Sequence, residues 1–257
     1  MLKTEHIHYN IGRHRILENI SVTFQPGVFN MILGPNGSGK STFLKIFSGE
    51  ITHFEGSVLY GNKSIHSEKK EQLAKYRAVM SQQTELGFPL TVEEVIMMGR
   101  YPHFDFNASK KDEAICAEVI EKLKLQPFRQ RNYLTLSGGE KQRVQFARVL
   151  AQVWEQPTAG PRYLFLDEPL SSLDINYQQE FLQIAKAFPN TVLVAIMHDI
   201  NLAIQYADQL FFLKQGQMVA QGKPEEILSA QLLEEVFDVK TVIINNPLTG
   251  KPLVVFK

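Results

Sequence analysis

The chain has 257 residues, which is enough for one large domain, or a core with a subdomain, around a sizeable hydrophobic core. Hydrophobic residues make up 44% and charged residues 21%, as in ordinary globular proteins. Lys+Arg and Asp+Glu both total 27, so the zero formal charge argues against a protein that binds nucleic acid over a broad basic surface.

The chain contains one cysteine, Cys116, so an internal disulfide is excluded and a reducing compartment is indicated. The start, MLKTEHIHYNIG, lacks the apolar core of a signal peptide. No stretch approaches the ~18 apolar residues of a membrane-spanning helix. We therefore expect a soluble, cytoplasmic protein that would serve a membrane only through a partner.

The N-terminal part of the chain is predicted to form strands. Ile20, Val22 and Phe24 alternate with polar residues, which is typical of a half-buried strand, and Pro26-Gly27 would end it. The apolar residues 31–33 then predict a buried strand that runs into a glycine-rich loop, and a helix is expected over residues 41–47.

The character becomes helical between about Val92 and Val153. Ser109 and Asp112 form a plausible capping pair, and an apolar stripe follows at Ile115, Val119 and Leu123. A second helix is expected from residue 137 to about residue 153.

Strand patterns return after this helical part. The apolar runs 163–166 and 192–196 suit parallel strands that are covered on both faces. Residues 211–213 and 218–220 flank Gln215-Gly216, which predicts a hairpin. The pattern as a whole indicates an α/β core split by a helical insertion.

A phosphate-binding loop is predicted at residues 34–41, where GPNGSGKS lies between a strand and a helix. Glycines let backbone N–H groups approach phosphate oxygens, and the helix start adds partial positive charge. Lys40 would reach the β- and γ-phosphates, and the Ser41 hydroxyl would serve Mg²⁺. A glycine-rich turn with a chance lysine is the alternative.

Two carboxylates follow the apolar run at residues 163–166, at Asp167 and Glu168. Ligands of open α/β sheets bind at the carboxyl edge of the strands. Asp167 would hold Mg²⁺, directly or through water, and Glu168 would act as general base on the attacking water. An acidic pair that caps a helix is the alternative.

The stretch LSGGE at residues 136–140 is more specific. Ser137 and Glu140 form a capping box. Gly138 and Gly139 inside it are unfavourable for a helix unless something approaches the backbone closely. We interpret this as a second phosphate-binding helix start; an N-cap with a flexible entry is the alternative.

These motifs, in this order and over nearly the whole chain, resemble the ATP-binding cassette (ABC) ATPases. The resemblance implies a P-loop NTPase core with a mostly parallel sheet, an N-terminal antiparallel β portion and an inserted helical subdomain. It implies one domain over 1–257, with its core at 1–88 and 155–257 and the helical signature subdomain at 89–154. Two copies would pack head to tail, with each ATP between the phosphate loop of one copy and the signature of the other.

The same resemblance assigns roles to further residues. Gln82, with Gln83 as the alternative, would be the Q-loop glutamine, which helps to coordinate Mg²⁺ and couples the site to a partner. His198 would contact the γ-phosphate, and Asp174, in the D-loop 171–174, would bridge the two monomers. Tyr9 would stack on adenine or would simply be a core tyrosine, since the family usually places this aromatic nearer Ile11. The nucleotide-binding set is Gly34, Pro35, Asn36, Gly37, Ser38, Gly39, Lys40, Ser41, Thr42 and Tyr9.

Several relatives share these motifs. DNA-repair and chromosome-structure ATPases carry a long coiled coil between the loop and the signature, and no sustained heptads occur here. Translation-type proteins carry two cassettes per chain, and a P-loop kinase would leave LSGGE unexplained. We expect the ATPase subunit of a transporter, bound to a membrane permease at the cytoplasmic face of the plasma membrane. A non-transport regulatory or scaffold cassette is a more distant alternative.

Two segments indicate the cargo. Residues 97–103 (MMGRYPH) resemble a segment of importers for iron siderophores, haem and cobalamin, where Pro102 would end the preceding helix and the segment would contact the permease. The Pro/Gly-rich stretch 154–162 is similar to that of haem (hemin) importer ATPases. We expect a haem importer, supplied indirectly by a periplasmic binding protein, with a siderophore or cobalamin importer as the alternative. His6, His8 and His103 are interpreted as incidental, not as haem or metal ligands.

Overall fold

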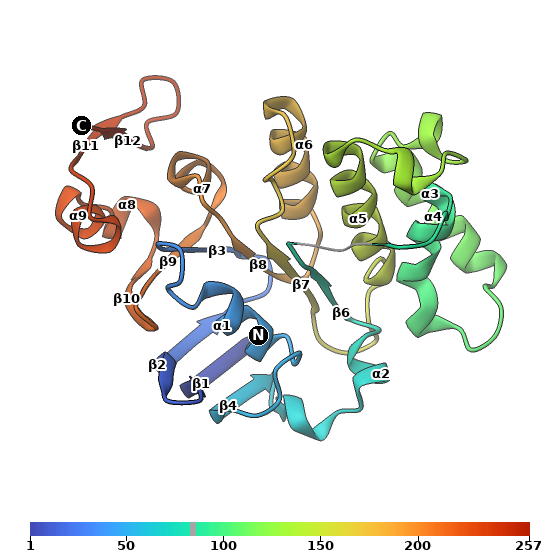
Figure 1. Cartoon of the computed structure of the whole chain (residues 1–257), viewed down its shortest axis with the longest axis horizontal. Helices are drawn as coiled ribbons and strands as arrows, with labels where there is room; N and C mark the ends of the chain where they lie inside the picture. Colours follow the sequence, from blue (N-terminus) through green and yellow to red (C-terminus); the bar gives the residue numbers. More distant parts are fainter. Residues whose placement is uncertain (83–85) are drawn as a thin grey trace. The chain divides into compact units, whose positions relative to one another are not determined.

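The computed structural model describes residues 1–82 and 86–257 and is drawn in Figure 1. Gln83, the alternative Q-loop residue, lies outside the described residues. The chain forms two compact units, Met1–Ser67 with Thr191–Lys257, and Glu68–Asn190. Within the described parts, every helix is too short or too polar to cross a membrane.

The first unit contains an antiparallel sheet with the strand order β2-β1-β4-β5. The predicted alternation is confirmed in β2, where Ile20, Val22 and Phe24 face the core. The antiparallel N-terminal portion implied by the family resemblance is therefore present. Its strands are β1 (Leu2–Ile11), β2 (His14–Phe24), β4 (Glu55–Tyr60) and β5 (Lys63–Ser64).

The strands of the six-stranded sheet that belong to this unit have the order β10-β9-β3-β8 and are mostly parallel. Every residue of β3 and β8 is buried, as the continuous apolar runs predicted. Strands β9 and β10 form the predicted hairpin around residues 215 and 216. The elements are β3 (Phe29–Leu33), α1 (Lys40–Phe47), β8 (Thr191–Ile196), β9 (Gln209–Lys214) and β10 (Gln217–Gly222).

The end of the chain adds elements that the sequence did not reveal. They are short, so hydrophobic periodicity identifies them poorly. Strands β11 and β12 pair antiparallel to form a separate hairpin. The elements are α7 (Ile200–Tyr206), α8 (Pro224–Ile227), α9 (Ala230–Phe237), β11 (Thr241–Asn245) and β12 (Pro252–Phe256).

The second unit contains a parallel pair of strands and most of the helices. Ser109 and Asp112 close the predicted capping box, and the stripe at Ile115, Val119 and Leu123 is buried. The elements are α2 (Lys70–Leu73), β6 (Arg77–Met80), α3 (Val92–Met97), α4 (Lys110–Lys122), α5 (Gly138–Gln152), β7 (Arg162–Asp167) and α6 (Ile175–Lys186).

The segment 97–103 is packed into this unit. Helix α3 ends at Met97, earlier than Pro102 would require, and a 3₁₀ helix over Met98–His103 follows. The segment is closely packed at Gly99, because a Cβ there would lie 2.1 Å from the carbonyl oxygen of Arg148. The guanidinium of Arg100 is 1% exposed and donates to Asp112 Oδ1 at 2.9 Å.

The loop at residues 154–162 is also held firmly. The guanidinium of Arg162 donates to the carbonyl oxygens of Trp154 and Pro189, each at 2.9 Å, and lies 4.7 Å from the centre of the Phe188 ring. The indole N–H of Trp154 donates to Glu118 at 2.8 Å. The two ends of the Pro/Gly-rich stretch are therefore anchored in the second unit, while residues 158–160 are exposed.

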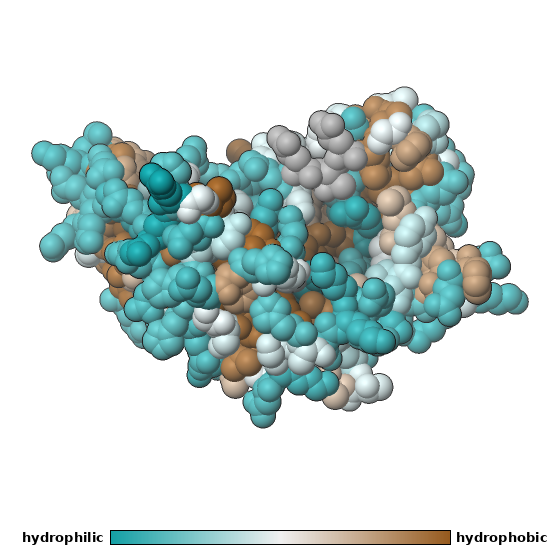
Figure 2. Space-filling view, turned by 60° about the horizontal axis from the view of Figure 1, so that its bottom comes forward, coloured by the Kyte–Doolittle hydropathy of each residue, from teal (hydrophilic) through white to brown (hydrophobic). Residues whose placement is uncertain are grey.

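The only cysteine is enclosed. Cys116 on α4 is 1% exposed, and burial raises the pKa of its thiol to about 12. Its sulfur lies 3.8 Å from that of Met97. On the face drawn in Figure 2, hydrophilic residues cover most of the surface and hydrophobic residues form smaller areas between them.

Candidate functional site

The glycine loop has glycine where the backbone demands it. Gly34 follows β3, and a Cβ on it would lie 2.0 Å from the carbonyl oxygen of Leu213. A Cβ on Gly39, which has φ 102°, would lie 2.7 Å from Leu17 Cδ2 and 3.0 Å from the carbonyl oxygen of Ile16. Backbone from β2 and β9 therefore closes around the loop, and only residues without Cβ fit at these two points.

Polar groups gather inside this loop. The Lys40 side chain is 5% exposed, and its Nζ donates to the carbonyl oxygens of Gly34 and Pro35, each at 2.9 Å. The hydroxyl of Ser38 is buried and has no hydrogen-bond partner within the described residues. A buried ammonium and an unpaired hydroxyl at the start of a helix suit an anionic ligand.

His198 emerges at the same edge of the sheet as this loop. Ile32 and Ile196 are paired in the parallel register of β3 and β8, and the N–H of Met197 donates to the carbonyl oxygen of Ile32 at 3.1 Å. The His198 side chain is exposed and lines a hollow of about 220 Å³. Both segments thus follow parallel strands at the carboxyl edge, where ligands of such sheets bind.

In the second unit the structure brings two predicted residues together. Strand β7 is buried along its whole length and ends at Asp167, which is 6% exposed. Glu168 then takes φ 50°, a left-handed conformation that is uncommon for a glutamate and is often found at functional sites. The amide Nε2 of Gln82 donates to Glu168 Oε2 at 2.6 Å.

The predicted magnesium ligands fit the chemistry of that ion. Ser41, Gln82 and Asp167 offer hydroxyl, amide and carboxylate oxygens, and Mg²⁺ prefers oxygen ligands. The described residues contain no group of three or more His, Cys, Asp or Glu side chains arranged around a metal.

The start of α5 has the predicted capping box. The N–H of Ser137 donates to Glu140 Oε2 at 2.7 Å, and the N–H of Glu140 donates to Ser137 Oγ at 3.3 Å. The first of these bonds holds the pKa of the Glu140 carboxyl below its usual range. Part of the close approach predicted at the glycines comes from the chain itself: a Cβ on Gly139 would lie 2.9 Å from the carbonyl oxygen of Ser172, whereas one on Gly138 would meet nothing nearer than 3.6 Å.

Asp174 has a local role that its sequence position could have revealed. Its carboxylate accepts the N–H of Tyr177 at 3.0 Å and caps α6, as Asp commonly does at a helix start. Gln142, which sequence reasoning missed, donates from Nε2 to the carbonyl oxygen of Pro169 at 2.8 Å. It links α5 to the segment that follows Glu168, and no motif in the sequence identifies it.

Tyr9 and the histidines lie in ordinary surroundings. Tyr9 is half-buried on β1 and pairs with Leu17, whose side chain packs against the glycine loop. Its role with adenine stays a prediction. His6 Nδ1 lies 2.8 Å from Asn19 Oδ1, and His103 Nε2 lies 2.7 Å from the carbonyl oxygen of Gln152.

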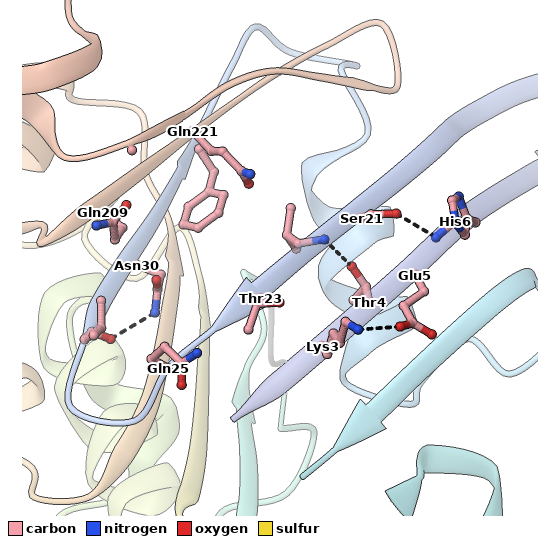
Figure 3. A pocket seen from close by; sticks show the side chains of 14 residues that line it. Lys3, Thr4, Glu5, His6, Ser21, Thr23, Gln25, Asn30, Gln209 and Gln221 are labelled. Atoms are coloured by element: carbon pink, nitrogen blue, oxygen red, sulfur yellow. Dashed lines mark hydrogen bonds and ion pairs between the residues drawn. The ribbon is translucent and has the colours of Figure 1, made fainter. Parts of the chain in front are cut away.

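A separate hollow of about 660 Å³ lies in the first unit among β1, β2, β3, β9 and β10 (Figure 3). Side-chain amides surround this hollow (Figure 3). Several polar groups that line it bond to one another or to nearby backbone: Lys3 forms an ion pair with Glu5, and Asn30 Nδ2 donates to the carbonyl oxygen of Val28 at 2.9 Å. None of the predicted site residues lines this hollow. We therefore place the candidate site at the motifs.

Comparison with known proteins identifies the family of the chain. The model of the family described as ABC transporter matches residues 17–171. The chain is 41% identical to the "Hemin import ATP-binding protein HmuV" of Gloeobacter violaceus, over 99% of this chain and 94% of the relative. It is 38% identical to the protein of that name from Escherichia coli O157:H7, over 99% of each. Among solved structures, "Dimeric structure of a post-hydrolysis state of the ATP-binding cassette MJ0796 bound to ADP and Pi" superposes with a TM-score of 0.73 at 27% identity, over 87% of this chain and 98% of that one.

Proposed function

Because this chain belongs to the ABC transporter family, we propose that it is the ATP-hydrolysing subunit of an importer for hemin. The observation that carries the ATPase part is the contact between Gln82 and Glu168 at the end of a buried strand, in a chain that also contains the glycine loop with Lys40. The cargo rests on the names of the relatives and on the segments 97–103 and 154–162.

In the proposed reaction the loop 34–41 holds the phosphates of ATP. Lys40 exchanges its two carbonyl partners for phosphate oxygens and offsets the charge that develops as the terminal phosphoryl group leaves. Ser41, Gln82 and Asp167 would hold Mg²⁺, which supplies Lewis-acid stabilisation of phosphate charge when bound.

Glu168 is the proposed general base. Its carboxylate accepts a proton from the attacking water, and Gln82, bonded to it at 2.6 Å, orients that carboxylate. His198 would donate a hydrogen bond to the γ-phosphate. The left-handed backbone of Glu168 supports this role, since such conformations persist mainly where the surroundings hold them for function.

We further propose that two copies close head to tail on ATP. The capped start of α5, with Ser137, Gly138, Gly139 and Glu140, would then face the γ-phosphate bound by the partner copy, because helix N-termini attract anions. Asp174 would lie at the contact between copies, where its neighbour Ile175 is 72% exposed. The solved cassette MJ0796, bound to ADP and Pi, is described as dimeric.

The permease would bind the second unit at the cytoplasmic face of the membrane. Tyr101, Phe88 and Phe106 are large hydrophobic residues with exposed fractions of 58%, 72% and 95%. Exposed aromatic side chains are common at protein interfaces. In segment 97–103, Gly99 and Arg100 serve internal packing, which leaves Tyr101 as the residue best placed to contact a partner. A periplasmic binding protein would deliver the cargo without touching this chain.

The hydrolysis proposal is tested with Glu168→Gln. We expect ATP to bind with nearly unchanged affinity and turnover to fall at least about 100-fold, because general-base catalysis contributes about 10²- to 10⁴-fold. The variant should also dimerise in Mg-ATP, measured by light scattering. Glu180→Gln, on the next helix, is the matched control and should hydrolyse normally. Normal turnover by Glu168→Gln would refute the assigned base.

The cargo is tested in liposomes that contain the permease from the same gene neighbourhood and the binding protein. We expect hemin, delivered by the binding protein, to raise ATP turnover, while a ferric siderophore or cobalamin leaves it unchanged. Stimulation by one of those two instead would overturn the hemin assignment. Nucleotide binding without hydrolysis under all conditions would favour a regulatory or scaffold role.

A further inference from the structure

Helix α7 begins two residues after His198 and has only seven residues. Isolated helices shorter than about 12–15 residues are marginal in water, so α7 depends on its neighbours. Ile200, Ala203 and Ile204 are buried and face the core of the first unit. Another side of the helix meets β12 of the C-terminal hairpin, as Figure 1 shows.

One side chain joins the first turn of α7 to this hairpin. Asn201 Nδ2 donates to the carbonyl oxygen of Val254 at 3.0 Å, and the N–H of Val254 donates to Asn201 Oδ1 at 2.8 Å. The amide therefore bonds to β12 as a neighbouring strand would, through one donor and one acceptor. This reciprocal pair fixes both the distance and the orientation of the helix relative to the strand.

A second link joins the last turn. Lys251 Nζ donates to the carbonyl oxygens of Gln205 at 2.7 Å and Ile204 at 3.4 Å. A cation at a helix C-terminus bonds to the last carbonyl groups and interacts favourably with the helix dipole. The hairpin therefore forms hydrogen bonds with both the first and the last turn of α7.

The same hairpin stands beside the histidine. His198 lines the hollow of about 220 Å³ together with Phe256 of β12 and Thr241 of β11, and with Leu233 and Phe237 of α9. The backbone just before it is tied to β3 through Met197. His198 is therefore held by the sheet on its N-terminal side and by α7 on its C-terminal side.

We infer that the C-terminal hairpin positions His198 for ATP hydrolysis, with Asn201 and Lys251 as its positioning residues; this rests on the proposed function, in which His198 contacts the γ-phosphate. The loop 34–41 lies on other elements, so loosening the hairpin leaves nucleotide binding intact. Loosening the hairpin would instead displace His198, and small misplacements of catalytic groups slow a reaction strongly.

The test compares Asn201→Ala with Asn245→Ala, an exposed asparagine on the other strand of the same hairpin. We expect Asn201→Ala to lower kcat about 10-fold while the Kd for ATP stays within about 2-fold. In a His198→Ala background the same substitution should cause no further loss, because both act through one group. Asn245→Ala should match the parent. Unchanged kcat in Asn201→Ala, or an independent loss in the double variant, would overturn the inference.

A second measurement needs no hydrolysis. Hydrogen exchange of the nucleotide-free chain should quicken over residues 198–206 in Asn201→Ala and, more mildly, in Lys251→Met, which keeps the aliphatic stem. Asn245→Ala should leave these amides as they are. If the parent chain hydrolyses no ATP, the proposed function fails, and exchange still decides whether the hairpin holds α7. Unchanged exchange in both variants would remove the inference.

Discussion

Helices α1 and α5 both begin beside glycine, and both starts are proposed to face phosphate, yet only α5 is closed by side chains of its own. Gly39 precedes α1 and offers no side-chain cap, whereas Ser137 and Glu140 cap α5 reciprocally. The first turn of α1 is shaped by the closely packed backbone of β2 and β9 and by the folded-back Lys40. The start of α5 is complete within a single copy of the chain, which suits a surface that meets its ligand only when a second copy arrives.

The largest effect should come from Lys40→Ala at the start of α1. The variant loses the ammonium that lies over the glycine loop, and charge-assisted bonds to phosphate are among the strongest in proteins. We expect ATP affinity to fall about 100-fold, as two such bonds at about 1.5 kcal/mol each would give. Titration calorimetry measures this.

Lys45→Ala is the control for that substitution. Lys45 lies in the last turn of the same helix, and its Nζ forms an exposed ion pair with Glu50 Oε1 at 3.6 Å. Nucleotide affinity should be unchanged in this variant. Equal affinities for Lys40→Ala and the parent chain would contradict the role of the loop.

Gly139→Ala should have the next largest effect, at the start of α5. The added Cβ would meet the carbonyl oxygen of Ser172 at 2.9 Å, so backbone must move. We expect a loss of about 1–3 kcal/mol in the free energy of unfolding, measured in urea, as for other overpacked sites. Gly138→Ala is the matched control, because its Cβ has room and alanine favours the helix by up to about 1 kcal/mol. Equal destabilisation by the two would show that the contact with Ser172 is unimportant.

The smallest effect should come from the cap itself. Ser137→Ala removes the acceptor for the N–H of Glu140 and should lower the free energy of unfolding by about 1 kcal/mol. It should leave ATP binding to a single copy unaltered, because the start of α5 is proposed to face the ATP that the partner copy binds. Weakened ATP binding by a strictly monomeric Ser137→Ala would break the contrast between the two helix starts.

Low pH should remove the stability that the ionised Glu140 contributes to the start of α5. The pKa of Glu140 is lowered in the folded chain, so its ionised form contributes stability above the unfolded pKa of about 4.3, and the contribution is lost as pH falls through the folded value. The stability gap between Glu140→Gln and the parent should therefore narrow below about pH 4. A constant gap across this range would count against the capping bond.

Much of the fold and site was predictable because it depends on local pattern. Unbroken apolar runs identified β3, β7 and β8, and the motifs placed Lys40, Asp167 and Glu168 at strand ends and helix starts. The sequence also indicated that something must approach the signature glycines. It did not indicate that Ser172 of the same chain does so at Gly139, because that contact depends on how α5 packs.

The remainder was not predictable because it depends on pairing between distant residues. Asn201 and Val254 lie 53 positions apart, and no motif connects a short helix to a two-stranded hairpin. The left-handed backbone at Glu168 could not be predicted from the sequence either, since glutamate rarely adopts this conformation. The roles of Gln82, His198, Asp174 and Tyr9 rest on family resemblance and remain predictions.

The enclosed thiol of Cys116 has a practical consequence for experiments on this chain. With its pKa raised to about 12, the sulfur is almost entirely protonated near neutrality, and the thiolate is the form that attacks maleimides and iodoacetamides. A single cysteine introduced at the exposed tip of the C-terminal hairpin, such as Leu248→Cys, would therefore take up a fluorophore selectively. The native residue can stay in place, and the motion of the hairpin during turnover becomes observable by optical spectroscopy.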